Sequence, residues 1–484
     1  MRVPAILLAS ILAVPLFAAG PTTTSNDDSC DIAVQPAATL LLPYFEVDFK
    51  SPQSTAVTTL FTVTNVSNQP QIAHVTLWTD WGYPALTFPI FLTGYDVQGI
   101  NLYDVFARAV IAPGQGSGGT SIATPVPFNA TPGSQPASNT SNPRFLSNVA
   151  TACTNLPGVF PQSLLTDIQQ AFTTGIPAGS AIGCAPPPPG TGAADRLGGA
   201  HTHAIGYATI DVVATCAAKT PASTDYYTGV LLYDNVLTGD YQQIVPAQGY
   251  AQGGPLVHIR AIPEGGAAGT VVSTNLPYTF YDRYTVGLPA SRSIDRRQPL
   301  PSVFGPRFIN GGPTSFNTSL KIWREGLIGG NAACKDYVRN SAVPIVEIVR
   351  FDEHENATVF TPLPILAPPQ PFPTALTFLA STGNFSFFPP PSASGDVGGW
   401  LYLNLNNGGS TAYSVGLVPP GVPRDFVTNT STGVGVRQSQ NWVITSMFAA
   451  PTFATEATAV ALGNGCSPSP KVGAQIAPAK DLNP

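Results

Sequence analysis

The chain has 484 residues, of which 43% are hydrophobic and 10% charged, and its formal net charge is −6. This composition is too apolar for a chain that is disordered throughout. Because Lys and Arg are not clustered, it also argues against a nucleic-acid partner. The 46 Gly and 50 Pro favour many turns and few long helices, so we expect an all-β protein with long loops.

The N-terminus has the pattern of a secretory signal peptide over residues 1–20. Arg2 precedes an apolar run from Ile6 to Phe17, and the small residues Ala18, Ala19 and Gly20 follow it. The run is too short for a transmembrane helix, and no later stretch resembles one. We therefore expect a secreted protein, periplasmic, at the cell surface or extracellular, with no transmembrane segment and a flexible leader over residues 21–38.

The six cysteines are even in number, and in an exported chain they predict disulfides. No CxxC pair occurs, which argues against zinc. Of the possible pairings we favour Cys153 with Cys184, because these two residues bracket one compact insertion.

Residues 39–113 predict an immunoglobulin-like β-sandwich. Its central feature is the pair of alternating runs TTLFTVTN (58–65) and IAHVTLWTD (72–80), which are rich in β-branched and aromatic residues. Polar residues and Pro70 separate the runs, so we expect the two strands to form a hairpin within one sheet. The end of this region, NLYDVF, predicts a short helix or turn.

Residues 114–199 change to Gly, Ser, Thr, Asn and Pro and predict an insertion. Within it, residues 163–174 predict one short helix, because Leu164, Leu165, Ile168, Ala171 and Phe172 fall on one helical face. We expect Ser163 to cap this helix and Gly175 to end it.

Residues 200–465 predict one or two further sandwich units. In WLYLNLN, Leu401, Leu403 and Leu405 alternate with Trp400, Tyr402 and Asn404, as in a strand with one buried and one exposed face. A polar tail follows over residues 466–484. The expected fold class is thus all-β, with tandem or fused immunoglobulin-like sandwiches, long Gly/Pro-rich loops and one short helical insertion.

The motifs LLLPYFEVDF, TLFTVTN, HVTLWTDWG, GYATIDVV, LVHI, FDEHEN and GGWLYLNL together resemble a family of uncharacterised secreted bacterial β-rich proteins. The resemblance covers most of the mature chain. It implies export and a β architecture, and it brings no known activity, cofactor or catalytic residue.

The densest polar cluster follows the strand-like run IVEIVRF and consists of Asp352, Glu353, His354 and Glu355. Oxygen-rich loops favour Ca²⁺, so we consider a calcium site here. Adjacent residues on an extended chain point in opposite directions, however. A solvated, charged turn is therefore the stronger interpretation, and we expect no other cofactor.

His201 and His203 share one face if their segment is extended, which is a geometry found in metal sites. The sequence shows no third ligand nearby, so a polar strand edge is the favoured interpretation. For a glycosidase, Glu46, Asp48, Asp80, Glu347 and Asp352 are candidate acids, but nothing in their local sequence distinguishes a catalytic pair.

The segment LWTDWGY places aromatic side chains beside an acid at the end of a predicted strand. Aromatic rings next to polar groups bind sugars and protein partners. Asp80, Trp81 and Tyr83 are therefore our candidate binding residues, and a packed corner of the sandwich is the alternative.

Together these features predict an exported structural or binding protein, whose partner is a glycan or a protein at the cell surface. The alternative is a secreted hydrolase, acting on glycans, that uses the carboxylate-rich loop. The absence of the common catalytic motifs favours the binding protein.

Overall fold

The computed structural model describes residues 32–80, 82–111, 160–180, 182, 197–215, 226, 230–261, 297–298, 300–301, 303–311, 316–324, 347–360, 374–379, 398–405, 428–429, 434–435, 441–449 and 453–462. These residues form mostly antiparallel β-strands, together with two short α-helices. The predicted all-β class is confirmed. No helix in the described part of the chain has the length and apolar character needed to cross a membrane.

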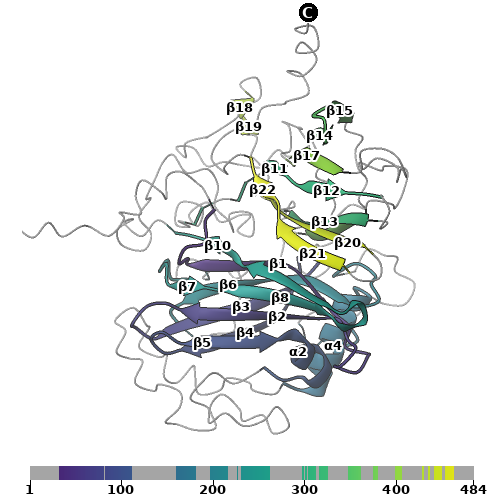
Figure 1. Ribbon diagram of the computed structural model, residues 1–484. Helices are drawn as coiled ribbons and strands as arrows, with labels where there is room; N and C mark the ends of the chain where they lie inside the picture. Colours follow the sequence, from purple (N-terminus) through teal and green to yellow (C-terminus); the bar gives the residue numbers. More distant parts are fainter. Residues whose placement is uncertain are drawn as a thin grey trace, which may run out of the picture.

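Two facing sheets form the larger half of the molecule, in the lower part of Figure 1. The central sheet has the strand order β10-β1-β6-β3-β4. Its strands are β1 (Thr39–Val47), β3 (Gln71–Thr79), β4 (Pro84–Leu92), β6 (Ala204–Val213) and β10 (Val257–Ile259). The outer sheet has the order β5-β2-β8-β9, with β7 beside β2. Its strands are β2 (Thr58–Asn65), β5 (Val97–Asn101), β7 (Leu237–Thr238), β8 (Asp240–Val245) and β9 (Tyr250–Pro255).

The main hydrophobic core includes side chains of both sheets. Leu40 of β1, Ile210 of β6, and Phe61 and Val63 of β2 are all buried in it. On β2 the alternate residues Leu60 and Thr62 are only half-buried. This alternation is the one that the sequence predicts, because successive strand side chains point to opposite faces.

The predicted hairpin of β2 and β3 is wrong, because the two strands lie in different sheets. β2 pairs with β5, β7 and β8, whereas β3 pairs with β4 and β6. The polar link between them crosses from one layer to the other. Buried Asn65 holds this crossing, since its Nδ2 donates to the carbonyl oxygens of Gln69 (2.7 Å) and Thr93 (2.8 Å).

Both helices pack at one end of the central sheet. α2 (Leu102–Arg108) and α4 (Gln162–Thr173) meet through Phe106 and Phe172, whose ring centroids are 5.0 Å apart. The helix predicted over 163–174 is confirmed, and Gly175 follows it with a φ of 71°. The predicted cap is wrong, because Pro161 occupies the N-cap position and no side chain caps the helix.

A third and a fourth sheet form the upper part of Figure 1. The bridging sheet has the order β16-β13-β20-β21, and the distal sheet has the order β15-β14-β17-β11-β22 with β12 beside β17. Their strands are β11 (Val303–Gly305), β12 (Arg307–Ile309), β13 (Phe316–Arg324), β14 (Glu347–Asp352), β15 (Ala357–Phe360), β16 (Thr374–Leu379), β17 (Gly398–Asn404), β20 (Asn441–Ala449), β21 (Phe453–Thr458) and β22 (Val460–Ala461). A small ribbon joins β18 (Thr428–Asn429) to β19 (Val434–Gly435).

The bridging sheet has two buried faces. On β13, Leu320 and Ile322 enter a second core with Phe304, Ile348 and Leu401 of the distal sheet, whereas Trp323 belongs to the main core. The Trp323 ring lies 6.0 Å from that of Tyr207 on β6. Leu401, Leu403 and Leu405 are buried as predicted. The predicted exposed face of this strand is wrong, because Tyr402 and Asn404 are buried as well.

All six cysteines lie outside the described residues, and so do the predicted signal peptide and the polar tail. The pairing of Cys153 with Cys184 therefore stays a prediction.

Candidate functional site

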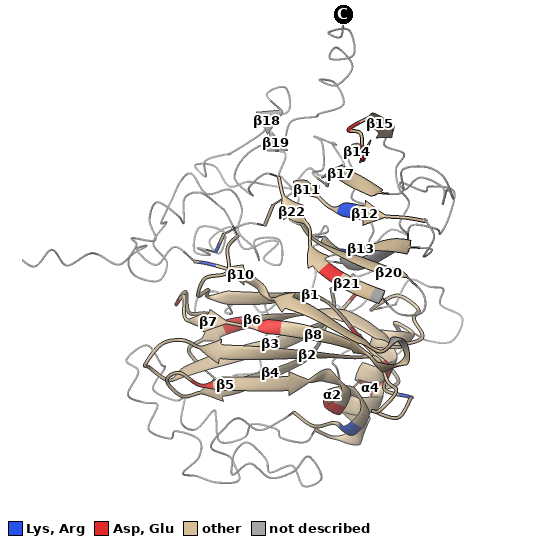
Figure 2. Ribbon diagram, in the orientation of Figure 1, with Lys and Arg blue, Asp and Glu red and all other residues tan. Residues whose placement is uncertain are grey.

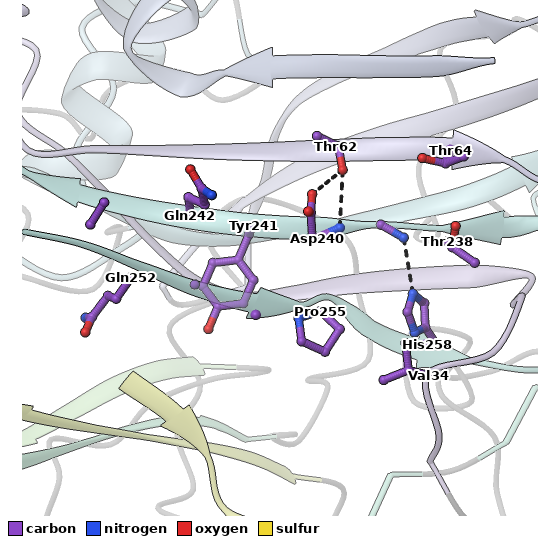
Figure 3. A pocket seen from close by; sticks show the side chains of 14 residues that line it. Val34, Thr62, Thr64, Thr238, Asp240, Tyr241, Gln242, Gln252, Pro255 and His258 are labelled. Atoms are coloured by element: carbon purple, nitrogen blue, oxygen red, sulfur yellow. Dashed lines mark hydrogen bonds between the residues drawn. The ribbon is translucent and has the colours of Figure 1, made fainter. Parts of the chain in front are cut away.

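A hollow of about 640 Å³ lies at the edge of the outer sheet where β8 and β9 pair, close to β10. Figure 3 shows side chains from β2, β8, β9 and β10 around it. Six of the lining residues carry the argument below: Thr62, Asp240, Tyr241, Gln252, Gly254 and His258.

Successive side chains along β8 alternate between exposed and buried positions. Asp240 and Gln242 are exposed, whereas Tyr241 is buried. The Asp240 carboxylate accepts a hydrogen bond from the hydroxyl of Thr62 on β2. Tyr241 is paired across the ladder with Gly254 of β9. A Cβ atom at Gly254 would meet no heavy atom within 4 Å, so this glycine leaves open space beside the tyrosine.

His258 contributes a neutral imidazole to the hollow. The ring is 1% exposed, and burial lowers its pKa to about 4. The backbone N–H of Gly239 donates to Nε2 at 3.2 Å. Because Nε2 accepts, the ring proton is on Nδ1. That Nδ1 is buried and has no hydrogen-bond partner among the described residues.

Glu456 of β21, whose side chain is 2% exposed, holds the side chain of Gln252 in place. Nε2 of Gln252 donates to Glu456 Oε2 at 2.8 Å, and the Tyr241 hydroxyl donates to Oε1 at 2.7 Å. Lys321 Nζ lies 2.7 Å from the same carboxylate. Burial, and then the negative charge of Glu456, raise the pKa of Tyr241 well above its usual value.

This network fixes the orientation of the Gln252 amide. Since Nε2 faces Glu456, Oε1 is at the other end of the amide, and it has no hydrogen-bond partner among the described residues. Nδ1 of His258 and Oε1 of Gln252 are thus two buried polar atoms, beneath the surface of the hollow, that the described protein atoms do not use.

A second polar cluster surrounds His201 and His203 just before β6. His201 Nε2 lies 2.8 Å from Asp80 Oδ2. His203 Nδ1 lies 2.6 Å from Glu46 Oε1, and its Nε2 lies 3.9 Å from Asp48 Oδ2. The sequence suggested neither pairing, because Glu46 and Asp48 come from the end of β1 and Asp80 from the end of β3.

This cluster is a set of histidine–carboxylate pairs. The His203 ring lies between its two carboxylates and uses a different nitrogen toward each. Within the described ranges, no three His, Cys, Asp or Glu side chains are placed to hold a metal ion together.

The predicted binding residues Asp80 and Tyr83 have partners within the protein. Asp80 is 3% exposed and accepts from the backbone N–H of Gly199 at 2.9 Å. The Tyr83 hydroxyl donates to the carbonyl oxygen of Ile182 at 2.6 Å, and burial raises its pKa to about 12. Trp81 lies outside the described residues, so a binding role for this segment stays a prediction.

Asp352, Glu353, His354 and Glu355 lie at the turn that joins β14 to β15. Asp352 Oδ1 accepts from the backbone N–H groups of His354 and Asn356, each at 2.9 Å. The hydrogen bond from the Asn356 side chain is the largest cause that lowers the pKa of Asp352. Glu355 has a φ of 63°. The carboxylate therefore stabilises the turn, and the calcium site stays a prediction.

The comparisons with known proteins add no relative. No protein-family model, no curated protein and no solved structure matches this chain. The resemblance to secreted bacterial β-rich proteins therefore stays a prediction.

Sequence reasoning missed Tyr241, Gln252 and His258. One local signal was present in YAQGGP, since adjacent glycines within a strand mark a place where another group approaches the backbone closely. The rest of the site depends on Glu456, which is 204 positions away from Gln252.

Proposed function

We propose that this protein is an exported binding protein and that its ligand occupies the hollow at the edge formed by β8 and β9. The observation that carries the proposal is the hollow itself. Its volume of about 640 Å³ lies within the usual range of small-molecule sites, about 300 to 1,000 Å³. Its polar groups are held by paired strands and by the Glu456 network, which supports a pre-formed site.

The lining favours binding over hydrolysis. Among the described residues that line the hollow, Asp240 is the only one with a carboxylate, and glycoside hydrolysis commonly uses two. His258 is neutral and its Nε2 already accepts a hydrogen bond, so it is not placed as a base for a nucleophile. The alternative hydrolase would rely on Asp352, whose carboxylate the turn already uses.

Export and the immunoglobulin-like unit are parts of the same proposal. The residues at the N-terminus support export through their signal-peptide pattern. Two facing antiparallel sheets around one core support a sandwich architecture.

The experiment is a thermal unfolding screen of the mature chain from residue 21. The probes are neutral oligosaccharides, hexapeptides, nucleosides, fatty acids and Ca²⁺. A ligand at about 100 times its dissociation constant stabilises the native state by about 2.7 kcal/mol, so at least one probe class is expected to raise the midpoint.

A matched pair of variants locates the binding. Gly254→Trp places a large ring in the hollow, because an added Cβ there meets no heavy atom within 4 Å. Val359→Trp places the same ring on β15 of the distal sheet, where Val359 is 49% exposed. The stabilisation should disappear in Gly254→Trp and persist in Val359→Trp. If no probe gives a shift that depends on Gly254, the proposed function is wrong.

A further inference from the structure

The turn between β4 and β5 holds a tyrosine in a strained backbone conformation and leaves it exposed. Tyr95 has a φ of 59°, which lies in the left-handed region that bulky residues rarely adopt. It is also 72% exposed, so burial of its ring does not compensate for the strain. Backbone strain of this kind is concentrated at functional sites, and the exposed ring is what this turn presents to the outside.

Backbone contacts fix this turn against the link between β2 and β3. The N–H of Tyr95 donates to the carbonyl oxygen of Ser67 at 2.9 Å. Gly94 packs so closely that a Cβ atom there would lie 2.6 Å from the carbonyl oxygen of Asn68. Asp96 accepts hydrogen bonds within the turn through both carboxylate oxygens. The protein itself therefore determines where Tyr95 lies.

The exposed neighbours of Tyr95 are apolar side chains and neutral amides. Val66 and Val97 are 37% and 46% exposed. Asn68 and Gln69 are exposed as well, and the contact between their amides is long, with Gln69 Nε2 at 3.5 Å from Asn68 Oδ1. We call these five residues the tip surface. It combines one aromatic ring with hydrogen-bond donors and acceptors.

The tip surface carries no charge. The chain between Thr58 and Asn101 contains no Lys or Arg, and Figure 2 shows no blue position along β2, β3, β4 and β5. The carboxylate of Asp96 is next to Tyr95 in the sequence, but this residue is 7% exposed. A charged ligand would find no opposite charge among the five residues, which favours a neutral one.

The size of the tip surface favours a sugar over a protein partner. A stable protein interface buries about 800 Å² on each side, whereas one aromatic side chain buries about 150 to 250 Å². A sugar ring is close in size to the ring of Tyr95. The C–H groups of a sugar pack on an aromatic face, and its hydroxyls both donate to and accept from flanking amides.

We propose that the tip surface binds a neutral glycan, with one sugar ring stacked on Tyr95 and its hydroxyls hydrogen-bonded to the amides of Asn68 and Gln69. None of the five residues lines the hollow. The tip surface is therefore a second site, and it goes beyond the proposed function.

The test is saturation-transfer NMR on the mature chain, a measurement suited to weak binding by a single stacked ring. The probes are maltohexaose, cellohexaose, chitohexaose and laminarihexaose, with a heparin hexasaccharide as the charged comparison. At least one neutral hexasaccharide should receive saturation from the protein. Tyr95→Gly should weaken this binding about tenfold or more, whereas Tyr95→Phe should retain it because the ring remains.

Tyr95→Gly separates a loss of binding from a loss of folding. Glycine accepts a positive φ without strain, so the unfolding midpoint of this variant should equal or exceed that of the wild type. Asn68→Ala should weaken binding about threefold or more through the loss of a hydrogen bond. Val359→Ala changes an exposed residue of β15 and should leave binding unchanged.

Three results would overturn the proposal. They are no saturation of any neutral hexasaccharide, saturation of the heparin hexasaccharide alone, and equal saturation with the wild type and with Tyr95→Gly. Binding that persists in Tyr95→Gly and disappears in Gly254→Trp would place the glycan in the hollow. That outcome would also overturn this proposal, but it would support the proposed function.

Discussion

At the scale of single residues, the charge of His203 is coupled to that of Glu46, which its Nδ1 contacts at 2.6 Å. A hydrogen bond to Glu46 raises the pKa of His203 above 6.5, against the effect of partial burial. Burial alone would raise the pKa of Glu46, but hydrogen bonds from His203 and Tyr44 and the charges of His203 and Lys321 together lower it below 4.5. The pair is therefore most stable when both groups are charged.

This pairing predicts a pH-dependent difference between the wild type and His203→Gln. The contribution of His203 is fully present below pH 6.5 and is lost as the pH rises through its higher folded pKa. The contribution of Glu46 is present above pH 4.5 and is lost as the pH falls through its lower folded pKa. His203→Gln should therefore lower the free energy of unfolding most between pH 4.5 and pH 6.5. The loss should be about 1 kcal/mol or less, because the pair is partly exposed.

The measurement is urea unfolding from pH 4 to pH 9. In a Glu46→Gln background the pH-dependent difference should shrink. A difference that grows toward pH 9 would contradict the assignment.

At the scale of elements, close packing sets where helix α4 lies on the central sheet. A Cβ atom at Gly206 of β6 would lie 2.2 Å from the Trp78 carbonyl oxygen and 2.8 Å from ring atoms of Phe172 and Phe45. Only glycine lets the helix and the neighbouring strand approach this closely.

Gly206→Ala should therefore lower the free energy of unfolding by about 1 to 3 kcal/mol through overpacking. Gly99→Ala is the matched control in a strand, because its Cβ atom meets nothing. Chemical denaturation of both variants checks the prediction, and equal midpoints would show that α4 moves freely on the sheet.

The other face of the central sheet contains a fully buried ion pair. Arg297 Nη1 lies 3.1 Å from Asp211 Oδ1 on β6, and the hydroxyl of Tyr226 donates to Oδ2 at 2.5 Å. Thr39 of β1 also donates to Asp211. The pair thus connects two neighbouring strands with the segments at residues 226 and 297.

Arg297→Met should destabilise the protein by about 3 kcal/mol or more, because it leaves the Asp211 charge buried without its cation. Adding Asp211→Asn to this variant should recover part of the loss. Thermal unfolding of the single and double variants measures both effects, and a double variant less stable than Arg297→Met would argue against a charge penalty.

At the scale of the whole molecule, the Glu456 network joins the outer sheet to the bridging sheet. Lys321 of β13 donates to Gln243 of β8 at 2.6 Å and to Glu456 of β21 at 2.7 Å. Its Nζ also lies 4.7 Å from the centroid of the Tyr44 ring on β1. Three sheets therefore meet at one lysine.

Lys321→Met should cost about 3 kcal/mol, because Glu456 stays buried without its cation. Hydrogen exchange should rise in β9 and β21, whereas it should stay near the wild-type rate in β4, on the far edge of the central sheet. An equal rise of hydrogen exchange in β4, β9 and β21 would show that the network does not couple these sheets locally. The control is the double variant Lys321→Met with Glu456→Gln, in which the buried carboxylate is replaced by a neutral amide.

The sequence by itself determined the local structure. The alternation in TTLFTVTN identified a strand and its buried face, the alternation in WLYLNLN identified a strand, and the spacing of Leu165, Ile168 and Phe172 identified α4. These patterns are readable because a strand or helix buries one face at a fixed period of residues. The all-β class follows from the same local information.

Only the tertiary structure decided which strands pair and which polar groups meet. Two alternating runs joined by a polar link fit a hairpin and a crossing between layers equally well. The sequence therefore does not decide whether β2 and β3 share a sheet, and the predicted hairpin is wrong. The hollow needs Tyr241, Gln252 and His258 on three strands, with Glu456 behind them. Hydrogen bonds between residues that are 204 or 215 positions apart leave no periodic trace in the sequence, because periodicity records burial and not partners.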